Sequence, residues 1–399
     1  MGYRTYTCPI AKACGGCAWL AVPYPIQLER KQRQVEELLG AMAGQDGAII
    51  ERIAGMDEPR AYRHKAATPF APGGTGGGQV RSGFYAQGTH RIVSCEGCLV
   101  EKDGLRRILN DVASLAQKRG ISPYNEDRHT GHLRHAIVRA GYATDDVLLT
   151  LVTREEHVPR VGQLADALAE ARPELTGIVQ NINDKRTNAL LGRACHTLWG
   201  SPVMYDELLG CRFAITATSF YQTNPAQTEL LYRLAIEGIR CAPGGSVLDA
   251  YCGCGTIGIC AAAQMEGIEL VGVERDAGGV AMARANAKAN GMSERVRIER
   301  ADATAWITRA ACDGKRFDTV ILDPPRAGST PAFIEATAAL APERVVYVSC
   351  NPVTQARDLV LFRKRGYRLA RVSPVDMFPH TKHVETVCLL TREQAKEHL

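Results

Sequence analysis

Long apolar runs are missing from this sequence: none approaches membrane-spanning length, and residues 1–12 lack the apolar core of a signal peptide. We therefore expect neither a membrane-spanning nor an exported protein, but a cytosolic monomer. A strong charge imbalance is also missing, because 48 lysines and arginines face 43 aspartates and glutamates, for a net charge of +5. Neither half forms a basic arm, so charge permits a nucleic-acid partner without arguing for one.

The length of 399 residues predicts more than one domain. From residue 246 onward, short β-branched runs alternate with amphipathic, alanine-rich segments, which is typical of a doubly wound α/β sheet. The predicted strands are 247–251, 269–274, 296–301, 317–322, 344–349, 367–375 and 384–390.

The last two predicted strands are separated only by "DMFPHTKH", which is too short for a crossover helix. They must therefore pair antiparallel. A reversed last strand is the usual form of S-adenosylmethionine-dependent methyltransferases, whereas nicotinamide-binding Rossmann domains stay parallel there. The predicted fold is α/β, with a Rossmann-like, seven-stranded methyltransferase sheet whose last strand is reversed.

The N-terminal half predicts a separate α+β module. Residues 24–44 form one amphipathic helix, two segments around 81–94 and 135–153 alternate like strands, and the glycine-rich 71–79 predicts a hairpin tip or loop. We expect this module over residues 1–210 and a methyltransferase domain over 211–399.

Cysteine spacing indicates a metal centre in this module. A reducing compartment disfavours disulfides, so closely spaced cysteines among the 14 point to ligation or catalysis. Cys8, Cys14 and Cys17 form a C-x5-C-x2-C run, and "SCEGC" adds Cys95 and Cys98, of which one is spare. Iron-sulfur and structural zinc sites both fit this pattern.

A glycine motif predicts a nucleotide-like cofactor. Gly253, Gly255 and Gly258 form G-x-G-x-x-G after a strand and before a helix, and an acidic residue ends the next strand. Such glycines let a cofactor approach the backbone, and the carboxylate binds ribose hydroxyls. The motif alone fits NAD as well as S-adenosylmethionine, and the reversed strand favours the latter. The candidate cofactor-binding residues here are Gly253, Gly255, Thr256, Glu274 and, near the adenine, Asp302.

"ILDPPRAGS" places Asp323 at the carboxyl end of the fourth strand, the edge where such sheets bind ligands. The motif resembles the signature of amino-group methyltransferases, but Arg326 stands where these have a stacking aromatic residue. A nitrogen target is therefore disfavoured, and Arg326 is expected to contact a phosphate or a base.

Cys350 ends the fifth strand at the same edge. Buried cysteines are commonly inert, but a thiol in this position can add to C6 of a pyrimidine and make C5 nucleophilic. A base must then remove the C5 proton. His380, His383 and Glu385 are candidates, and Glu385, at the start of the last strand, is preferred. Enzymes that methylate cytosine carry a second cysteine after the fourth-strand proline; its absence points to uracil.

Ten segments together resemble the RNA (uracil-5-)-methyltransferases that carry a [4Fe-4S] cluster, and most closely those acting on 23S ribosomal RNA. They are "CPIAKACGGC", "YRHKAATPF", "SGFYAQGTHRIV", "LRHAIVR", "QNINDKRTN", "SFYQTNP", "VLDAYCGCGTIGI", "LDPPRAG", "VSCNP" and "DMFPHTKHVETVCLL". The resemblance implies Cys8, Cys14, Cys17 and Cys98 as cluster ligands, Gln222, Tyr251, Glu274 and Asp323 around S-adenosylmethionine, Cys350 as nucleophile and Glu385 as base.

The resemblance also implies that helix 24–44 packs on the catalytic domain. Many members begin with an RNA-binding β-barrel domain, which we expect to be absent because Cys8 stands near the start. RNA contacts would then come from the central module: Arg63, Lys65, Arg134, Arg139, Lys185 and Arg186. The predicted activity is methylation of uridine C5 in 23S ribosomal RNA. The alternatives are the same chemistry on tRNA and, more remotely, an RNA-binding protein without catalysis.

Overall fold

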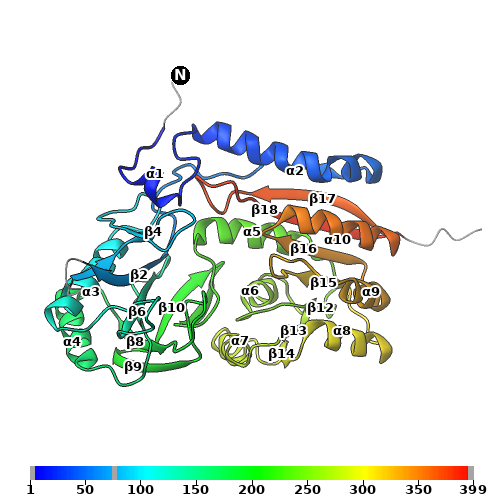
Figure 1. The fold of residues 1–399 in the computed structure, drawn as a ribbon. Coiled ribbons are helices and arrows are strands. Elements are labelled where there is room, and N and C mark those ends of the chain that lie inside the picture. The colour runs from blue at the N-terminus through cyan, green and yellow to red at the C-terminus, as the bar shows by residue number, and fades with distance from the viewer. Residues whose placement is uncertain (1–4, 74–78, 394–399) are drawn as a thin grey trace, which may run out of the picture.

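The structure is a computed structural model that describes residues 5–73 and 79–393. Two α/β parts lie side by side, and the long helix α2 (Tyr24–Asp46) runs across the top of the second one (Figure 1). None of the helices formed by the described residues is both long and apolar enough to cross a bilayer.

The second part is built on an eight-stranded sheet. Its order is β1 (Ile49–Ile50), β17 (Tyr367–Val375), β18 (Glu385–Arg392), β16 (Arg344–Ser349), β15 (Thr319–Leu322), β12 (Ser246–Asp249), β13 (Glu269–Glu274) and β14 (Val296–Arg300). All seven predicted strands are present. β18 pairs antiparallel with both β16 and β17, so the predicted reversal of the last strand is confirmed.

Several details of this sheet differ from the prediction: β12 covers Ser246–Asp249 instead of 247–251, β14 ends at Arg300 instead of 301, and β18 covers Glu385–Arg392 instead of 384–390. β1, which pairs parallel with β17, has only two residues and is too short to show any alternation. β15 begins at Thr319 instead of 317. The strand starts later because its two preceding residues have other partners. The Phe317 ring packs against Trp306, and the Asp318 carboxylate accepts a hydrogen bond from Ser246 N.

Helices cover both faces of the sheet. One face packs against α5 (Pro225–Glu237), α6 (Thr256–Gln264) and α7 (Ala277–Ala289); the other packs against α2, α8 (Ala303–Cys312), α9 (Pro331–Leu340) and α10 (Pro352–Lys364). On α2, Val35, Leu39 and Ala43 point into the same core as Leu369 and Val372 of β17. The N-terminal helix is therefore part of the second core.

The N-terminal part contains a six-stranded sheet covered by α3 (Leu105–Lys118) and α4 (Val161–Ala171). The strand order is β3 (Gln79–Ser82), β2 (Lys65–Gly73), β6 (Leu133–Ala140), β7 (Val147–Thr153), β8 (Gly177–Ile182) and β9 (Ala194–Gly200). A small hairpin joins β4 (Phe84–Tyr85) to β5 (Ile92–Val93), and α1 (Ala11–Cys14) lies in the cysteine-bearing segment. The glycine-rich 71–79 joins β2 to β3, and residues 74–78 lie outside the described part.

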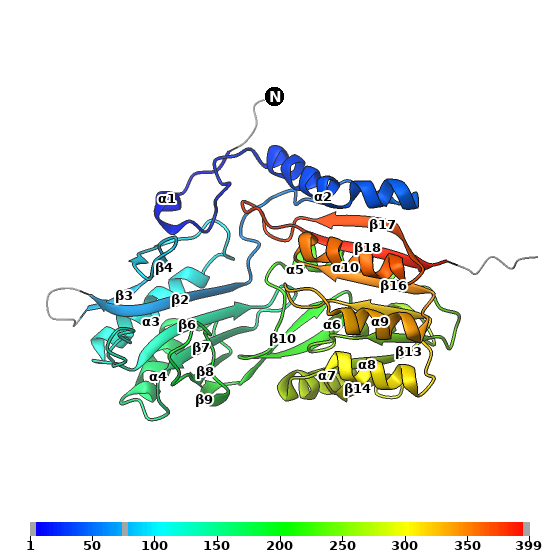
Figure 2. The ribbon, with the colours of Figure 1, turned by 45° about the vertical axis from the view of Figure 1, so that its right-hand side comes forward.

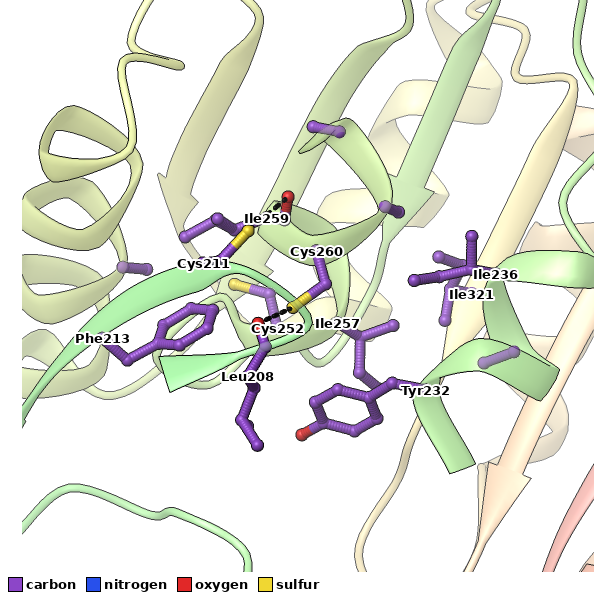
Figure 3. Close-up of a cluster of buried hydrophobic side chains, with 14 of the residues drawn as sticks. Leu208, Cys211, Phe213, Tyr232, Ile236, Cys252, Ile257, Ile259, Cys260 and Ile321 are labelled. Carbon is purple, nitrogen blue, oxygen red and sulfur yellow. Dashed lines mark hydrogen bonds between the residues drawn. The ribbon is translucent and has the colours of Figure 1, made fainter. Parts of the chain in front are cut away.

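A hairpin of β10 (Val203–Leu208) and β11 (Cys211–Thr216) joins the two parts. The boundary expected after residue 210 falls in its turn. The Cys260 thiol of α6 donates to Leu208 O at 3.5 Å, and the Cys211 thiol lies 4.0 Å from Ile259 O (Figure 3). The turn end of the hairpin thus packs against α6, the helix that follows the glycine motif.

Candidate active site

The chain brings Asp323, Cys350 and Glu385 to one edge of the large sheet. β15 and β16 are parallel neighbours, so Asp323 and Cys350, which follow them, lie at the same edge. β18 runs the other way, and its Thr386 is paired with Ser349 of β16. Because of this register, Glu385 lies beside Cys350. Because β18 is antiparallel to β16, its first residue, Glu385, lies at the end of β16, next to the thiol of Cys350.

The electrostatics of these three groups agree with this placement. Burial raises the pKa of Asp323 to about 7. Burial, and next the negative charge of Asp323, raise the pKa of Glu385 to about 8. Burial, Glu385 and Asp323 raise the pKa of Cys350 to about 11, while the exposed Arg326 lowers it. Glu385 thus lies in the field of Asp323, and Cys350 in the field of both carboxylates. A positive charge placed between the three groups would favour their ionised forms.

Cys350 is half-buried and not sealed in the core. The next residues fix the backbone there, since Asn351 Nδ2 donates to Arg326 O at 3.0 Å. Glu385 is 4% exposed, and no hydrogen bond is formed by its carboxylate within residues 5–73 and 79–393. Its position therefore depends on the backbone that carries it.

The glycine motif forms a tight turn between β12 and α6. Gly253 and Gly255 have left-handed φ angles of 55° and 84°. A Cβ at Gly253 would meet no atom within 4 Å, so open space lies above it. A Cβ at Gly258 would lie 2.9 Å from the Leu270 side chain, and Gly258 N donates to Asp249 Oδ2 at 3.2 Å. The third glycine is needed for close packing, and the first leaves room for a ligand.

Acidic side chains border this turn. Glu274 accepts hydrogen bonds from Gly253 N at 3.1 Å and Asp276 N at 2.7 Å, which ties the end of β13 to the glycine turn. Asp302 accepts from Ala305 N at 3.1 Å as the N-cap of α8. Both carboxylates thus have a structural partner in addition to any ligand they bind.

The remaining predicted cofactor residues lie around the same turn. The Thr256 hydroxyl lies 2.8 Å from the Tyr232 hydroxyl, and the Tyr251 ring packs on Phe333. Gln222 lines a small cavity with Lys65, Arg139 and Tyr221, where the two parts meet. The sequence prediction missed one neighbour of this region, Phe220, whose side chain is 72% exposed and whose carbonyl accepts from the Cys254 thiol at 3.3 Å.

Two of the six expected RNA contacts are buried. Arg134 donates to Asn183 O and Lys185 O, at 2.5 and 2.8 Å, and Arg139 donates to Ser219 O at 2.7 Å. These arginines hold neighbouring segments, which a sequence pattern cannot distinguish from a charged surface. Lys185 and Arg186 are exposed. Burial, Arg139 and Arg63 lower the pKa of Lys65 to about 7.

Four of the five N-terminal cysteines lie near one another. Burial is the main cause that raises the pKa of the Cys17 thiol, and Cys98, Cys14 and Cys8 add to it in that order. The fifth, Cys95, is buried and donates to Gly97 O at 3.1 Å. Among the residues that the structure describes, no three His, Cys, Asp or Glu side chains approach closely enough to hold a metal ion.

The sequence and the fold are both similar to those of known proteins. A family model described as "tRNA (Uracil-5-)-methyltransferase" matches residues 210–393. An uncharacterized RNA methyltransferase of Bacillus cereus is 39% identical over 385 residues, which cover 96% of this chain and 82% of that protein. Another, from Halalkalibacterium halodurans, is 38% identical over 383 residues, with the same coverage of 96% and 82%.

Among solved structures, the chain resembles a Pyrococcus abyssi tRNA (uracil-54, C5)-methyltransferase in complex with S-adenosyl-L-homocysteine. The TM-score is 0.75 at 26% identity, over 94% of this chain and 86% of that one. The match therefore includes the N-terminal part as well as the large sheet. This chain is an RNA methyltransferase and belongs to the RNA (uracil-5-)-methyltransferase family.

Proposed function

We propose that the enzyme transfers a methyl group from S-adenosylmethionine to C5 of a uridine in RNA. The observation that carries the proposal is the meeting of a half-buried thiol, Cys350, with the carboxylates of Asp323 and Glu385 at the carboxyl edge of the sheet. Family membership and a structural neighbour that binds S-adenosylhomocysteine support the same reaction.

The residues around the glycine turn fit the proposed cofactor. When bound, S-adenosylmethionine supplies an electrophilic methyl group on a positively charged sulfur. In the proposal, open space above Gly253 admits the cofactor, Glu274 accepts from its ribose hydroxyls and Asp302 lies by the adenine. Gln222, Tyr251, Gly255, Thr256 and Asp323 complete the pocket.

Cys350 and Glu385 act on the base in the proposed chemistry. The Cys350 sulfur adds to C6, and the electron pair displaced from the double bond makes C5 the atom that attacks the methyl group. C5 then carries both the new methyl group and its original hydrogen. Glu385 removes that proton, the C5–H electron pair restores the double bond, and the C6–sulfur pair returns to Cys350. The uridine must flip out of the base stack of the RNA to reach the half-buried Cys350 and the buried Glu385.

The RNA that we propose is 23S ribosomal RNA, on the sequence resemblance described above. Transfer RNA is the second candidate, and a specific observation favours it: the structural neighbour is named as a tRNA enzyme. Exposed Lys185 and Arg186 are suited to phosphates, and the exposed Phe220 ring is suited to stacking on a base. We place the reaction in the cytosol, with the enzyme acting as a monomer.

We also propose a [4Fe-4S] cluster on Cys8, Cys14, Cys17 and Cys98. Its support is the donor set: four neighbouring thiols from two segments, which is the chemistry that such clusters require. Its role is structural, since the methyl transfer needs no electron. An anaerobic preparation with broad visible absorption supports the cluster, and a colourless, zinc-containing one contradicts it.

The function is tested with unmodified ribosomal RNA and unmodified tRNA, each incubated with enzyme and methyl-labelled cofactor. Mass spectrometry of nuclease fragments then locates the label. We expect 5-methyluridine at a single position of one RNA pool. Label on a nitrogen, on cytosine or on neither RNA would refute the proposal.

A further inference from the structure

The loop between β17 and β18, residues 376–384, leads directly into Glu385 and is fixed by the catalytic part of the chain. Asp376 N donates to Ala54 O at 2.9 Å, and Gln227 Nε2 donates to Asp376 O at 3.1 Å. Asn224 Nδ2 donates to Met377 O at 3.0 Å. The beginning of the loop is thus held by the segment before α5 and by α5 itself.

His380, in the middle of this loop, is fully buried, and all four of its polar atoms have partners. Its backbone N donates to Gln27 Oε1 and its carbonyl accepts from Trp19 N, both at 2.9 Å. Nε2 lies 2.8 Å from Pro59 O, and Nδ1 lies 3.2 Å from Gln27 Nε2. A carbonyl only accepts, so Nε2 carries the hydrogen and Nδ1 is left as an acceptor. It faces Gln27 Nε2, whose two hydrogens are shared with Trp19 O at 3.0 Å and Val22 O at 2.7 Å. One neutral tautomer is compatible with both ring contacts.

The backbone of His380 is in an unfavourable conformation. Its φ angle is 66°, in the left-handed region that residues other than glycine rarely adopt. Such a conformation persists only when surrounding contacts determine it. Here those contacts come from three segments that are more than 300 residues away in the chain: Trp19, Gln27 and Pro59.

Further contacts join the same loop to α2. Lys31 Nζ donates to Asp376 Oδ1 at 2.5 Å and to Phe378 O at 3.1 Å, and the Tyr24 hydroxyl donates to Asp376 Oδ2 at 2.8 Å. Lys31 and Asp376 are both fully buried. Figures 1 and 2 both show the loop between β17 and β18 below the N-terminal end of α2, beside the segment that joins α1 to α2. The N-terminal segment therefore closes over the loop that presents Glu385.

The cysteine-bearing segment takes part in this arrangement. Trp19, whose backbone N holds the His380 carbonyl, stands two residues after Cys17, and Leu20 N donates to Cys17 O at 3.1 Å. Tyr62, which is buried, donates from its hydroxyl to Pro379 O at 3.0 Å. Tyr62 thus holds the carbonyl of Pro379, and Trp19 holds the carbonyl of His380. Through these two hydrogen bonds the loop is joined to the region around the four thiols.

We propose that His380 is a positioning residue that couples the cysteine-bearing N-terminal segment to Glu385, and so aligns this carboxylate for proton removal. The inference rests on the proposed function. Glu385 begins β18, where it is paired with Val375 of β17, and its carboxylate forms no hydrogen bond of its own among the described residues, so its alignment depends on this strand end and on the loop from His380 that leads into it. If His380 is released, the C5 proton stays in place, the C6–sulfur bond does not break and methylated RNA remains attached to Cys350.

The test uses His380→Asn and Gln27→Ala. Asparagine tolerates the left-handed conformation but is too short to reach Pro59 O, and Gln27→Ala removes two of the four contacts. The matched control is His129→Asn, a second left-handed histidine with φ of 54°, in the N-terminal part. Each variant is mixed with RNA and methyl donor, and the covalent adduct is quantified on a denaturing gel. The cofactor Kd is measured by calorimetry.

We expect both network variants to slow the elimination by about 10- to 100-fold, since a misplacement of about 1 Å can cost that much. The methylated adduct then accumulates, an RNA deuterated at uridine C5 shows a primary isotope effect, and the cofactor Kd is unchanged. His129→Asn behaves as the wild type.

Three results would overturn the inference: wild-type elimination in both variants, a loss of activity without adduct, or failure of both variants to fold. If both variants fail to fold, the contacts of His380 only stabilise the fold and have no separate role in positioning Glu385. Failure of the proposed function itself is distinguishable. In that case the wild type forms no 5-methyluridine and Glu385→Gln forms no adduct, whereas an adduct in Glu385→Gln alone refutes only the role of His380.

Discussion

Burial acts in the same direction on all three groups at the centre of the site. It raises the pKa of Asp323, Glu385 and Cys350, and the two carboxylates raise that of Cys350 further. The thiol is therefore protonated near neutral pH when nothing is bound. A sulfonium next to these groups would favour the thiolate and the two carboxylates together. In the proposed reaction, cofactor binding thus prepares the nucleophile and the base before the uridine enters.

The first prediction separates the two proposed catalytic residues. Cys350→Ala removes the sulfur that adds to C6, and we expect it to abolish 5-methyluridine formation and every covalent RNA complex. Glu385→Gln keeps the thiol but removes the base, so methylation of C5 proceeds and the adduct accumulates as a retarded band on a denaturing gel.

Cys312→Ala is the control for this pair, because Cys312 is exposed at the end of α8, away from the carboxyl edge. It should form product at the wild-type rate. Equal turnover by Cys350→Ala would refute the assignment of the nucleophile. A Glu385→Gln variant that releases product normally would refute that of the base.

The second prediction concerns pH and stability without ligands. Burial, followed by Asp323, raises the pKa of Glu385 from its ordinary 4.5 to about 8. Between these values the folded protein keeps a proton that the unfolded chain releases, so stability falls as pH rises across the window. One unit of pKa shift corresponds to about 1.4 kcal/mol. Glu385→Gln should therefore lose less stability than the wild type between pH 5 and pH 8.

Urea unfolding at both ends of that pH window measures the difference. Glu37→Gln, an exposed carboxylate on α2, is the control and should follow the wild type. An identical pH dependence in wild type and Glu385→Gln would show that the carboxyl group is not protonated in the folded state.

At the scale of elements, α2 is an N-terminal helix that completes a C-terminal core. Leu39 is fully buried among residues of the large sheet and its helices. The third prediction is that Leu39→Ala lowers the free energy of unfolding by about 2–5 kcal/mol, the usual cost of deleting a buried leucine side chain. Glu37→Ala, two residues earlier on the exposed face, should change it by less than about 0.5 kcal/mol. Equal effects of the two changes would mean that α2 does not share the core in solution.

The sequence predicts the elements of the large sheet well, for a physical reason. Parallel strands covered on both faces appear as continuous β-branched runs, and β16 and β17 have the predicted limits. The meeting of Asp323, Cys350 and Glu385 was predicted from the same strands. Each residue stands at a strand end, and the order of the strands brings these ends together. β1 was missed, since two residues show no pattern.

Contacts between segments that are distant in the chain could not be predicted from the sequence. A lone arginine looks the same whether it faces RNA or, like Arg134 and Arg139, holds a neighbouring backbone. The partners of His380 lie at Trp19, Gln27 and Pro59, and no local spacing connects them. The spacing of Cys8, Cys14 and Cys17 predicted a metal site but left the fourth ligand open between Cys95 and Cys98. Cys98 was chosen from the resemblance, and the cluster stays a proposal.

At the scale of the whole molecule, β6 connects the site to the outer part of the N-terminal sheet. Arg139, near its end, lies in the field of Cys254 beside the glycine turn, and Arg134, near its start, holds the loop of Lys185 and Arg186. The five residue steps from Arg134 to Arg139 span about 17 Å at strand geometry. β6 itself is buried, but an RNA whose uridine enters the site can reach the exposed pair of cations by spanning a distance of this order.

The fourth prediction follows from that distance. The double variant Lys185→Ala/Arg186→Ala should weaken RNA binding evenly across RNA sequences, with the cofactor Kd unchanged. The slope of log affinity against log salt should fall in magnitude by about 1.4–1.8, the value for two lost phosphate contacts. The control is Lys315→Ala/Arg316→Ala, an exposed cation pair just before β15, at the opposite edge of the sheet from Cys350. A control variant that loses as much affinity would mean that RNA binding follows total charge, whereas a selective loss at 185 and 186 places the RNA at the segment between β8 and β9.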